Sequence, residues 1–139
     1  MFSDQYLAGE LHQYDEPDWQ PLYDLIGVHL ADWFMWMHEV ELENGLHLHA
    51  YKHITTRRYF HLAADGAAFI YLSGGSYREI DRRDAIDAVF EEWAELTPPP
   101  DDADRAALRK ACRAAGPSAN TRRRKERAQG RRSEADAAA

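Results

Sequence analysis

Two dipeptides that favour a tight reversal of the chain, Asn44-Gly45 and Asp65-Gly66, divide its middle into four short apolar runs. The runs are residues 32–43, 46–54, 58–64 and 67–72. Asn-Gly and Asp-Gly between such runs are typical of β-hairpins, because the turn needs positive φ values that these residues accept. Thr55-Thr56-Arg57 is short enough to connect the second run to the third. The sequence therefore predicts a four-stranded antiparallel meander.

Helical patterns flank the meander. Pro21 suits a first helical turn, and the apolar residues from Leu22 to Leu30 follow helical spacing, which predicts a helix that begins near Asp18. A second helix is predicted from Asp81 to about Leu96, because its apolar residues recur at i, i+3, i+4 and i+7. We therefore expect an α+β fold in which flanking helices pack on one face of the meander, in the order α-β-β-β-β-α.

Three further segments complete the expected organisation. Residues 1–16 fit either a short docked helix or an irregular strap, and residues 73–76 fit a flexible connector. A short third helix is predicted over 101–115, closed by Gly116-Pro117 and preceded by a stiff run of three prolines.

Charge and aromatic content split the chain into two unlike parts. Residues 1–96 hold 18 Asp or Glu against 6 Lys or Arg and all 16 aromatic residues, whereas residues 97–139 hold 6 acidic against 11 basic residues. Only the first part has the material for a large core. The sequence predicts an acidic globular domain over 1–96, a Pro-rich spacer with a short helix over 97–116, and a disordered Arg-rich tail over 117–139.

The register of the first predicted hairpin suggests a histidine cluster. If Asn44 and Gly45 alone form the turn, His38 lies opposite Tyr51, and His49 and His53 are its diagonal neighbours, with Cβ atoms roughly 7 Å away. Three histidines with an open position are a known catalytic zinc arrangement, and imidazole also binds iron or copper. A metal site at His38, His49 and His53 is therefore one hypothesis. A structural role for these side chains, or a pH-sensitive binding surface, are the alternatives.

Two groups of basic residues are candidate anion-binding sites. Arg57 and Arg58 lie in a turn with two threonines and a tyrosine, a set that can hold a phosphate or a carboxylate or can pair with the acidic domain. The tail carries seven cations within eleven residues, and flexible chains of this kind bind polyanions by releasing counterions. These seven are Arg122, Arg123, Arg124, Lys125, Arg127, Arg131 and Arg132. No aromatic residue accompanies them, so only phosphate contacts are expected.

Several classes of function find no support in the sequence. No run approaches the roughly 20 apolar residues that cross a bilayer, so no membrane partner is expected, and the first residues do not resemble a signal peptide. The single cysteine, Cys112, forms no internal disulfide, which fits a reducing cytoplasmic location. No nucleotide-binding glycine motif or HExxH spacing is present, and no particular cofactor is indicated.

The function expected from these features is that of a non-enzymatic binding or regulatory module. The acidic domain would contact a protein partner, and the basic tail would contact nucleic acid or the same partner. The alternative is a metal-binding protein or metal-dependent enzyme that uses the histidine cluster. A homodimer is also compatible with the sequence, through a second face of the meander that carries Met35 and Met37.

Overall fold

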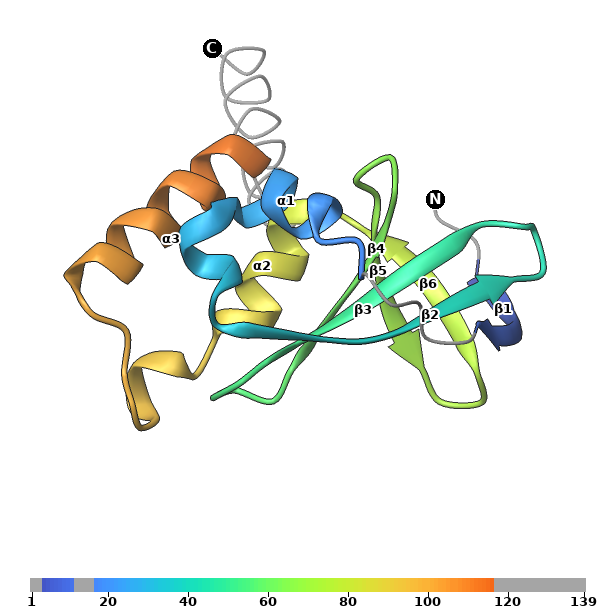
Figure 1. The fold of residues 1–139 in the computed structure, drawn as a ribbon, viewed down its shortest axis with the longest axis horizontal. Helices are drawn as coiled ribbons and strands as arrows, with labels where there is room; N and C mark the ends of the chain where they lie inside the picture. Colours follow the sequence, from blue (N-terminus) through green and yellow to red (C-terminus); the bar gives the residue numbers. More distant parts are fainter. Residues whose placement is uncertain (1–3, 12–16, 117–139) are drawn as a thin grey trace, which may run out of the picture.

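The computed structural model describes residues 4–11 and 17–116 (Figure 1). The strands in this part are β1 (Asp4–Leu11), β2 (Phe34–Leu42), β3 (His47–His53), β4 (Tyr59–Ala63), β5 (Ala68–Leu72) and β6 (Ser76–Ile80). The helices are α1 (Gln20–Ala31), α2 (Arg82–Phe90), the single 3-10 turn η1 (Trp93–Glu95) and α3 (Asp102–Ala115). The four predicted central strands and the three predicted helices are present, but α2 ends at Phe90 rather than near Leu96. Residues 4–11 form a strand, so the expected short helix or irregular strap is wrong there. The predicted tail, 117–139, lies outside the described residues.

The strands form a closed antiparallel barrel, and the expected four-stranded meander is wrong. Each strand pairs with the next one along the chain, and β1 pairs with both β2 and β6, which closes the ring. The helices lie together at one side of this barrel, where they cover part of its outer surface (Figure 1).

The two strands that close the barrel, β1 and β6, show only weak strand patterns in the sequence. On β1, Tyr6 is 55% exposed and Leu7 is 36% exposed, so the strand shows no clear apolar alternation. Its backbone provides the pairing instead, as where the Leu7 amide donates to the Gly75 carbonyl (3.0 Å). Residues 73–76, expected to be a connector, form the turn into β6 and its first residue.

Both Gly-containing hairpin turns have three-residue loops, whereas the predicted register assumed two. The Leu42 amide donates to the Leu46 carbonyl (2.8 Å), and the Ala63 amide donates to the Ala67 carbonyl (2.9 Å). Gly45 has φ +85°, which is the left-handed position that follows a type I turn in such loops. The extra residue shifts the partner of every residue on the opposite strand by one.

This shift, together with a bulge in β2, changes which side chains share a face. Val40 pairs with Leu48 rather than with His49, and His38 pairs with Ala50 rather than with Tyr51. The register changes again between Trp36 and His38, so that Trp36 pairs with Tyr51. Side chains alternate between the two faces of a strand, so the one-residue shift moves the residues of β2 from His38 to Leu42 to the opposite face relative to β3. Beyond the bulge, Trp36 again shares the predicted face with Tyr51.

Two hydrophobic clusters result. The inner cluster fills the barrel and consists of Val40, Leu42, Leu48, Ala63, Phe69 and Tyr77, with Leu46 and Ala67 packed against it. The outer cluster joins the outer face of the barrel to the helices. It consists of Leu22, Leu25, Ile26, Leu30, Ala31, Phe34, Tyr51, Phe60, Leu62, Ala68, Ala85, Ile86, Val89, Phe90, Trp93 and Ala111. Tyr51, Phe60 and Leu62 pack with Ile86 and Phe90 in the outer cluster, whereas Phe69 belongs to the inner cluster.

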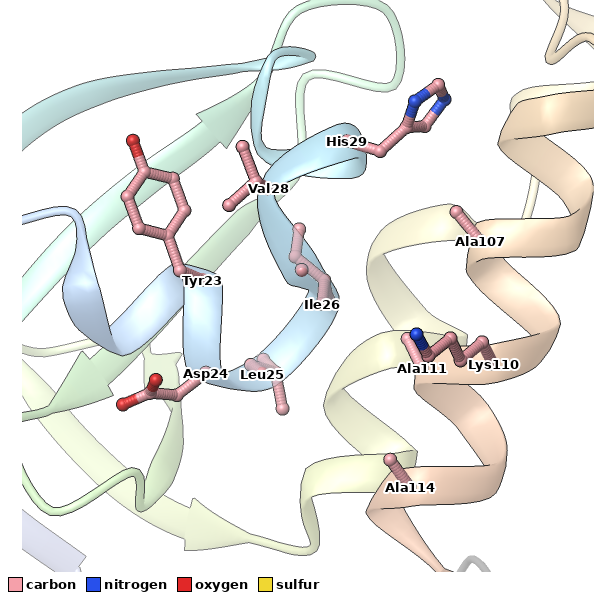
Figure 2. A pocket seen from close by; sticks show the side chains of 11 residues that line it. Tyr23, Asp24, Leu25, Ile26, Val28, His29, Ala107, Lys110, Ala111 and Ala114 are labelled. Carbon is pink, nitrogen blue, oxygen red and sulfur yellow. The ribbon is translucent and has the colours of Figure 1, made fainter.

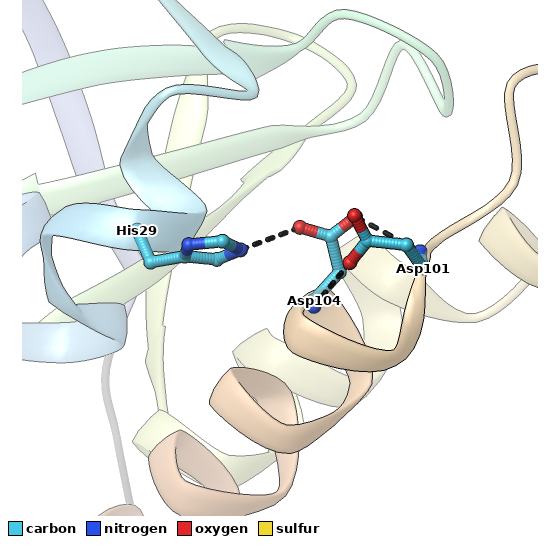
Figure 3. A group of neighbouring side chains, drawn as sticks. All are labelled: His29, Asp101 and Asp104. Carbon is cyan, nitrogen blue, oxygen red and sulfur yellow. Dashed lines mark hydrogen bonds and ion pairs between the residues drawn. The ribbon is translucent and has the colours of Figure 1, made fainter.

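A buried carboxylate connects α3 to α1. Asp104 is 3% exposed, and its Oδ1 accepts hydrogen bonds from His29 Nε2 (2.7 Å) and Trp33 Nε1 (3.1 Å). Its Oδ2 accepts from the Asp101 amide (3.0 Å), while the Asp101 side chain accepts from the Asp104 amide, which forms a capping box at the start of α3 (Figure 3). Burial acts to raise the pKa of Asp104, but the hydrogen bonds outweigh burial and lower the pKa below its ordinary value.

We expect Asp104→Ala to lower the free energy of unfolding by about 2–4 kcal/mol, because it removes the acceptor of His29 and Trp33 and one of the two hydrogen bonds of the capping box. Asp102→Ala, two residues away and fully exposed, is the matched control and should cost less than about 1 kcal/mol. Urea unfolding followed by circular dichroism measures both. Equal losses for the two variants would show that Asp104 does not hold α3 in place.

Candidate ligand pocket at the barrel mouth

One end of the barrel interior opens into a cavity of about 310 Å³. Its lining residues come from five strands, β1, β2, β4, β5 and β6: Leu7, His38, Tyr59, His61, Tyr71 and Tyr77. They share the inward face because of the register, in which His38 and His61 both pair with Ala50, and Tyr71 pairs with Tyr77. The cavity therefore exists only because the sheet closes.

The pocket has a buried floor and an exposed rim. His61 (8% exposed) and Tyr77 (3%) form the floor, with their rings edge to face at a centroid distance of 5.2 Å. On the rim, Tyr59 stacks on His61 at 5.7 Å, and Tyr71 meets Tyr77 edge to face at 5.3 Å. Tyr59 and Tyr71 are 38% and 54% exposed, so parts of both rings remain accessible to a ligand.

The His61 imidazole is neutral at physiological pH. Burial, with a contribution from nearby His38, lowers the pKa of His61 to about 4. A neutral imidazole has one donor and one acceptor nitrogen. Within residues 4–11 and 17–116, no hydrogen bond joins either ring nitrogen of His61 to another residue. The floor therefore offers a donor and an acceptor with no protein partner in the described part of the chain.

A cation lies at the rim of this pocket. The Nζ atom of Lys52 is 5.7 Å from the centroid of the Tyr59 ring, within the range of a cation–π contact. This charge disfavours a positively charged ligand beside Tyr59 and is compatible with a neutral one.

The three histidines predicted to bind metal lie in separate environments. His38 lines the barrel pocket, whereas His49 and His53 lie on the outer face of β3. His49 Nδ1 accepts from Trp36 Nε1 (3.1 Å), and His53 Nδ1 accepts from the amides of Thr55 and Thr56 (both 3.0 Å). In the neutral ring, an acceptor Nδ1 leaves the proton on Nε2, so neither nitrogen of these two rings presents a free lone pair to a metal.

The structure also places the predicted basic residues. Arg58 donates to the Ala88 carbonyl (2.6 Å) and forms ion pairs with Glu91 (2.9 Å) and Glu92 (3.5 Å), so two glutamates that follow α2 balance its charge. Arg57 is exposed in the turn between β3 and β4. The seven tail residues from Arg122 to Arg132 lie outside the described part of the chain.

The described residues contain two other candidate sites, a cavity and a group of titratable side chains, and both are weaker candidates than the barrel pocket. A cavity of about 410 Å³ lies between α1 and α3, where Leu25 and Ile26 face Ala107 and Ala111; its polar lining residues, such as His29 and Lys110, are exposed (Figure 2). His29, Asp101 and Asp104 form a group whose potential ligand atoms lie within 4.8 Å of one another (Figure 3). Their hydrogen bonds to one another account for their arrangement as the link between α1 and α3.

The chain has no detectable match. Comparison with protein-family models, with curated proteins and with solved structures finds nothing similar. No helix in the described residues is both long and apolar enough to span a membrane. The function must therefore be inferred from the site itself.

Most of this pocket is not predictable from the sequence. Tyr59 and His61 are two residues apart on a predicted strand, which places them on one face, and this was the available signal. Tyr77 lies on β6, which was not predicted as a strand, so nothing in the sequence brought Tyr77 beside His61.

Proposed function

We propose that this protein is a non-enzymatic binding module whose barrel pocket holds an uncharged planar aromatic molecule. The observation that carries the proposal is the neutral His61 imidazole, which lies without a described hydrogen-bond partner beneath two partly exposed tyrosine rings.

The lining of the pocket fits this class of ligand. Ring faces and edges at Tyr59 and Tyr71 can stack on a planar ligand, and such contacts contribute about 0.5–1.5 kcal/mol each. His61 can donate to and accept from the polar edge of a heterocycle. Lys52 beside Tyr59 argues against an organic cation. A volume of about 310 Å³ is at the lower end of the range for ligand sites and suits one or two fused rings.

Tyr71→Ala should weaken binding of a planar probe by about 3- to 10-fold, because it removes one stacking ring. Indole and adenine are suitable probes, titrated into the full chain by calorimetry or by NMR chemical-shift mapping. Tyr6→Ala is the matched control, because Tyr6 is 55% exposed on β1 and does not line the pocket. The Tyr6→Ala variant should bind each probe with the same affinity as the unaltered protein.

A second variant separates stacking from hydrogen bonding. His61→Phe keeps a ring in the floor but has no donor or acceptor, so adenine should lose affinity while indole, with its single N–H group, loses less. If neither probe binds at millimolar concentration, or if Tyr6→Ala weakens binding as much as Tyr71→Ala, the pocket is not the site.

We also propose a basic protein partner and a cytoplasmic location. The excess of acidic residues in 1–96 (18 against 6 basic) supports contact with a basic protein surface. The single half-buried Cys112 supports a reducing, cytoplasmic setting.

A further inference from the structure

A second surface, far removed in chemistry from the barrel pocket, lies between α2 and α3. It is a groove of about 460 Å³ whose walls carry four guanidinium groups and whose remaining lining residues are an apolar side chain and a thiol. The residues that line it are Arg83, Arg105, Leu108, Arg109, Cys112 and Arg113. We call it the arginine groove.

Helical spacing aligns the arginines of α3. Arg105, Arg109 and Arg113 are each four residues apart, so they follow one another along one face of the helix at intervals of about 6 Å. Arg83 reaches the same groove from α2. Four positive charges therefore border one concave surface in a protein whose formal net charge is −7.

Acidic residues of the described chain neutralise little of this charge. Arg83 pairs with Asp87 (2.9 Å), and Arg105 approaches Asp102 (3.4 Å). Such surface pairs contribute about 0–1 kcal/mol, so an incoming anion can replace them. Within residues 4–11 and 17–116, Arg109 and Arg113 have no ion-pair partner. The groove thus presents guanidinium groups that are available to an external anion.

Further positive charge follows the groove residues in the sequence. Residues 105–125 contain eight Lys or Arg and no Asp or Glu. Six of the eight are Arg, whose planar fork of N–H donors matches the oxygens of a phosphate. These cations fall in two groups, at 105–113 and at 122–125, and cations spread along a chain fit a long polyanion better than a single small anion.

We propose that the arginine groove is a binding surface for the phosphate backbone of double-stranded nucleic acid, with little dependence on base sequence. The absence of aromatic residues after Trp93 removes base stacking as a source of affinity. Double-stranded nucleic acid has a higher density of phosphate charge than a single strand, and its binding does not depend on stacking of bases on aromatic side chains. A duplex is therefore the better ligand for a surface that carries arginines and no aromatic residue. Leu108 and Cys112 line the groove among the arginines and offer it an apolar surface.

The test is the salt dependence of duplex binding by the full chain. Fluorescence anisotropy with a labelled 20-base-pair duplex, at several KCl concentrations between 50 and 200 mM, gives the affinity and its salt slope. Arg109→Gln/Arg113→Gln should reduce the slope of log affinity against log salt by about 2 and weaken binding by about 10- to 100-fold near 0.1 M salt. Two duplexes of unrelated sequence should bind equally.

The control is Arg78→Gln, since Arg78 is exposed on β6 and pairs with Asp4, away from α3. This variant should bind as the unaltered chain does. Unchanged binding by the Arg109/Arg113 double variant would overturn the proposal and assign all affinity to other cations, such as those of 122–132. Equal or tighter binding of phosphatidylserine vesicles would also overturn it, because the groove would then recognise anionic lipid rather than nucleic acid. Loss of planar-ligand binding at the barrel pocket would not affect any of these outcomes.

Discussion

Between pH 7 and pH 4, the free energy of unfolding should fall by several kcal/mol, because two buried imidazoles stay neutral in the folded protein. Burial lowers the pKa of His53 to about 4, although the charge of Asp104 acts in the opposite direction. Burial and the proximity of His38 lower the pKa of His61 to about 4. In the unfolded chain both side chains titrate near pH 6.5.

The sign follows from proton linkage. Above about pH 6.5 both states are neutral at these positions, and the full stability is present. As the pH falls from about 6.5 to about 4, the unfolded chain binds protons that the folded protein does not, so stability is lost through this window. Each histidine contributes a loss of the order of 3 kcal/mol by this account.

Urea unfolding at pH 7.0, 5.5 and 4.2 measures the effect. His61→Phe should reduce the pH dependence by roughly half, because the phenyl ring does not titrate. His47→Gln is the control: the His47 side chain is about half exposed, and removing it should leave most of the dependence in place. If His61→Phe retains the full loss of stability between pH 7.0 and 4.2, the lowered pKa of His61 is not a cause of the pH dependence.

His53→Ala should destabilise the fold by about 4 kcal/mol, the largest single-residue effect we expect. His53 is completely buried, and its ring contacts Trp33, Phe34, Phe90 and Trp93 at centroid distances of 4.8–5.9 Å. Its Nδ1 accepts from two successive amides of the turn between β3 and β4, those of Thr55 and Thr56. Alanine leaves both a cavity among aromatic rings and two amides without their acceptor.

Two near-isosteric replacements separate the cavity from the lost acceptor. His53→Leu fills the apolar space without an acceptor, whereas His53→Asn keeps an acceptor oxygen close to the backbone. We expect His53→Asn to be the more stable of the two in spite of its apolar surroundings, because unsatisfied buried amides cost about 1–3 kcal/mol each. Chemical denaturation at pH 7 ranks the three variants. A more stable His53→Leu would show that His53 acts through packing alone.

The sequence predicted the helices and the central strands of this fold, but not the closure of the sheet into a barrel. Asn44-Gly45 and Asp65-Gly66 located both chain reversals, and apolar spacing located the helices, because these signals are local. The turn dipeptides did not show whether the loops contain two or three residues. Since the side-chain period of a strand is two, that single residue moved Val40 and His38 to the other face relative to β3.

The binding pocket was beyond prediction for a related reason. Its floor depends on Tyr77 meeting His61, which lie on strands that are not adjacent to each other. That contact requires β6 to join the sheet, which it does by pairing with β5 and with β1, and the pairing of β1 relies on backbone groups that are the same in every sequence. The arginines of α3, by contrast, were visible in the sequence, but their grouping with Arg83 required the packing of α3 beside α2.

The pairing of β1 on both sides also limits how copies of this chain can associate. In the described residues, every strand of the sheet has a neighbour on each side, so there is no unpaired strand onto which another molecule can add its own. A homodimer would therefore have to form through side-chain surfaces, such as the one around the 40%-exposed Met35, and not by extending hydrogen bonding from one subunit into the next. Residues 4–11 thus protect the edges of β2 and β6. Without them, the unpaired backbone groups of these two strands could pair with strands of other molecules, which is the step that leads to fibrous aggregates.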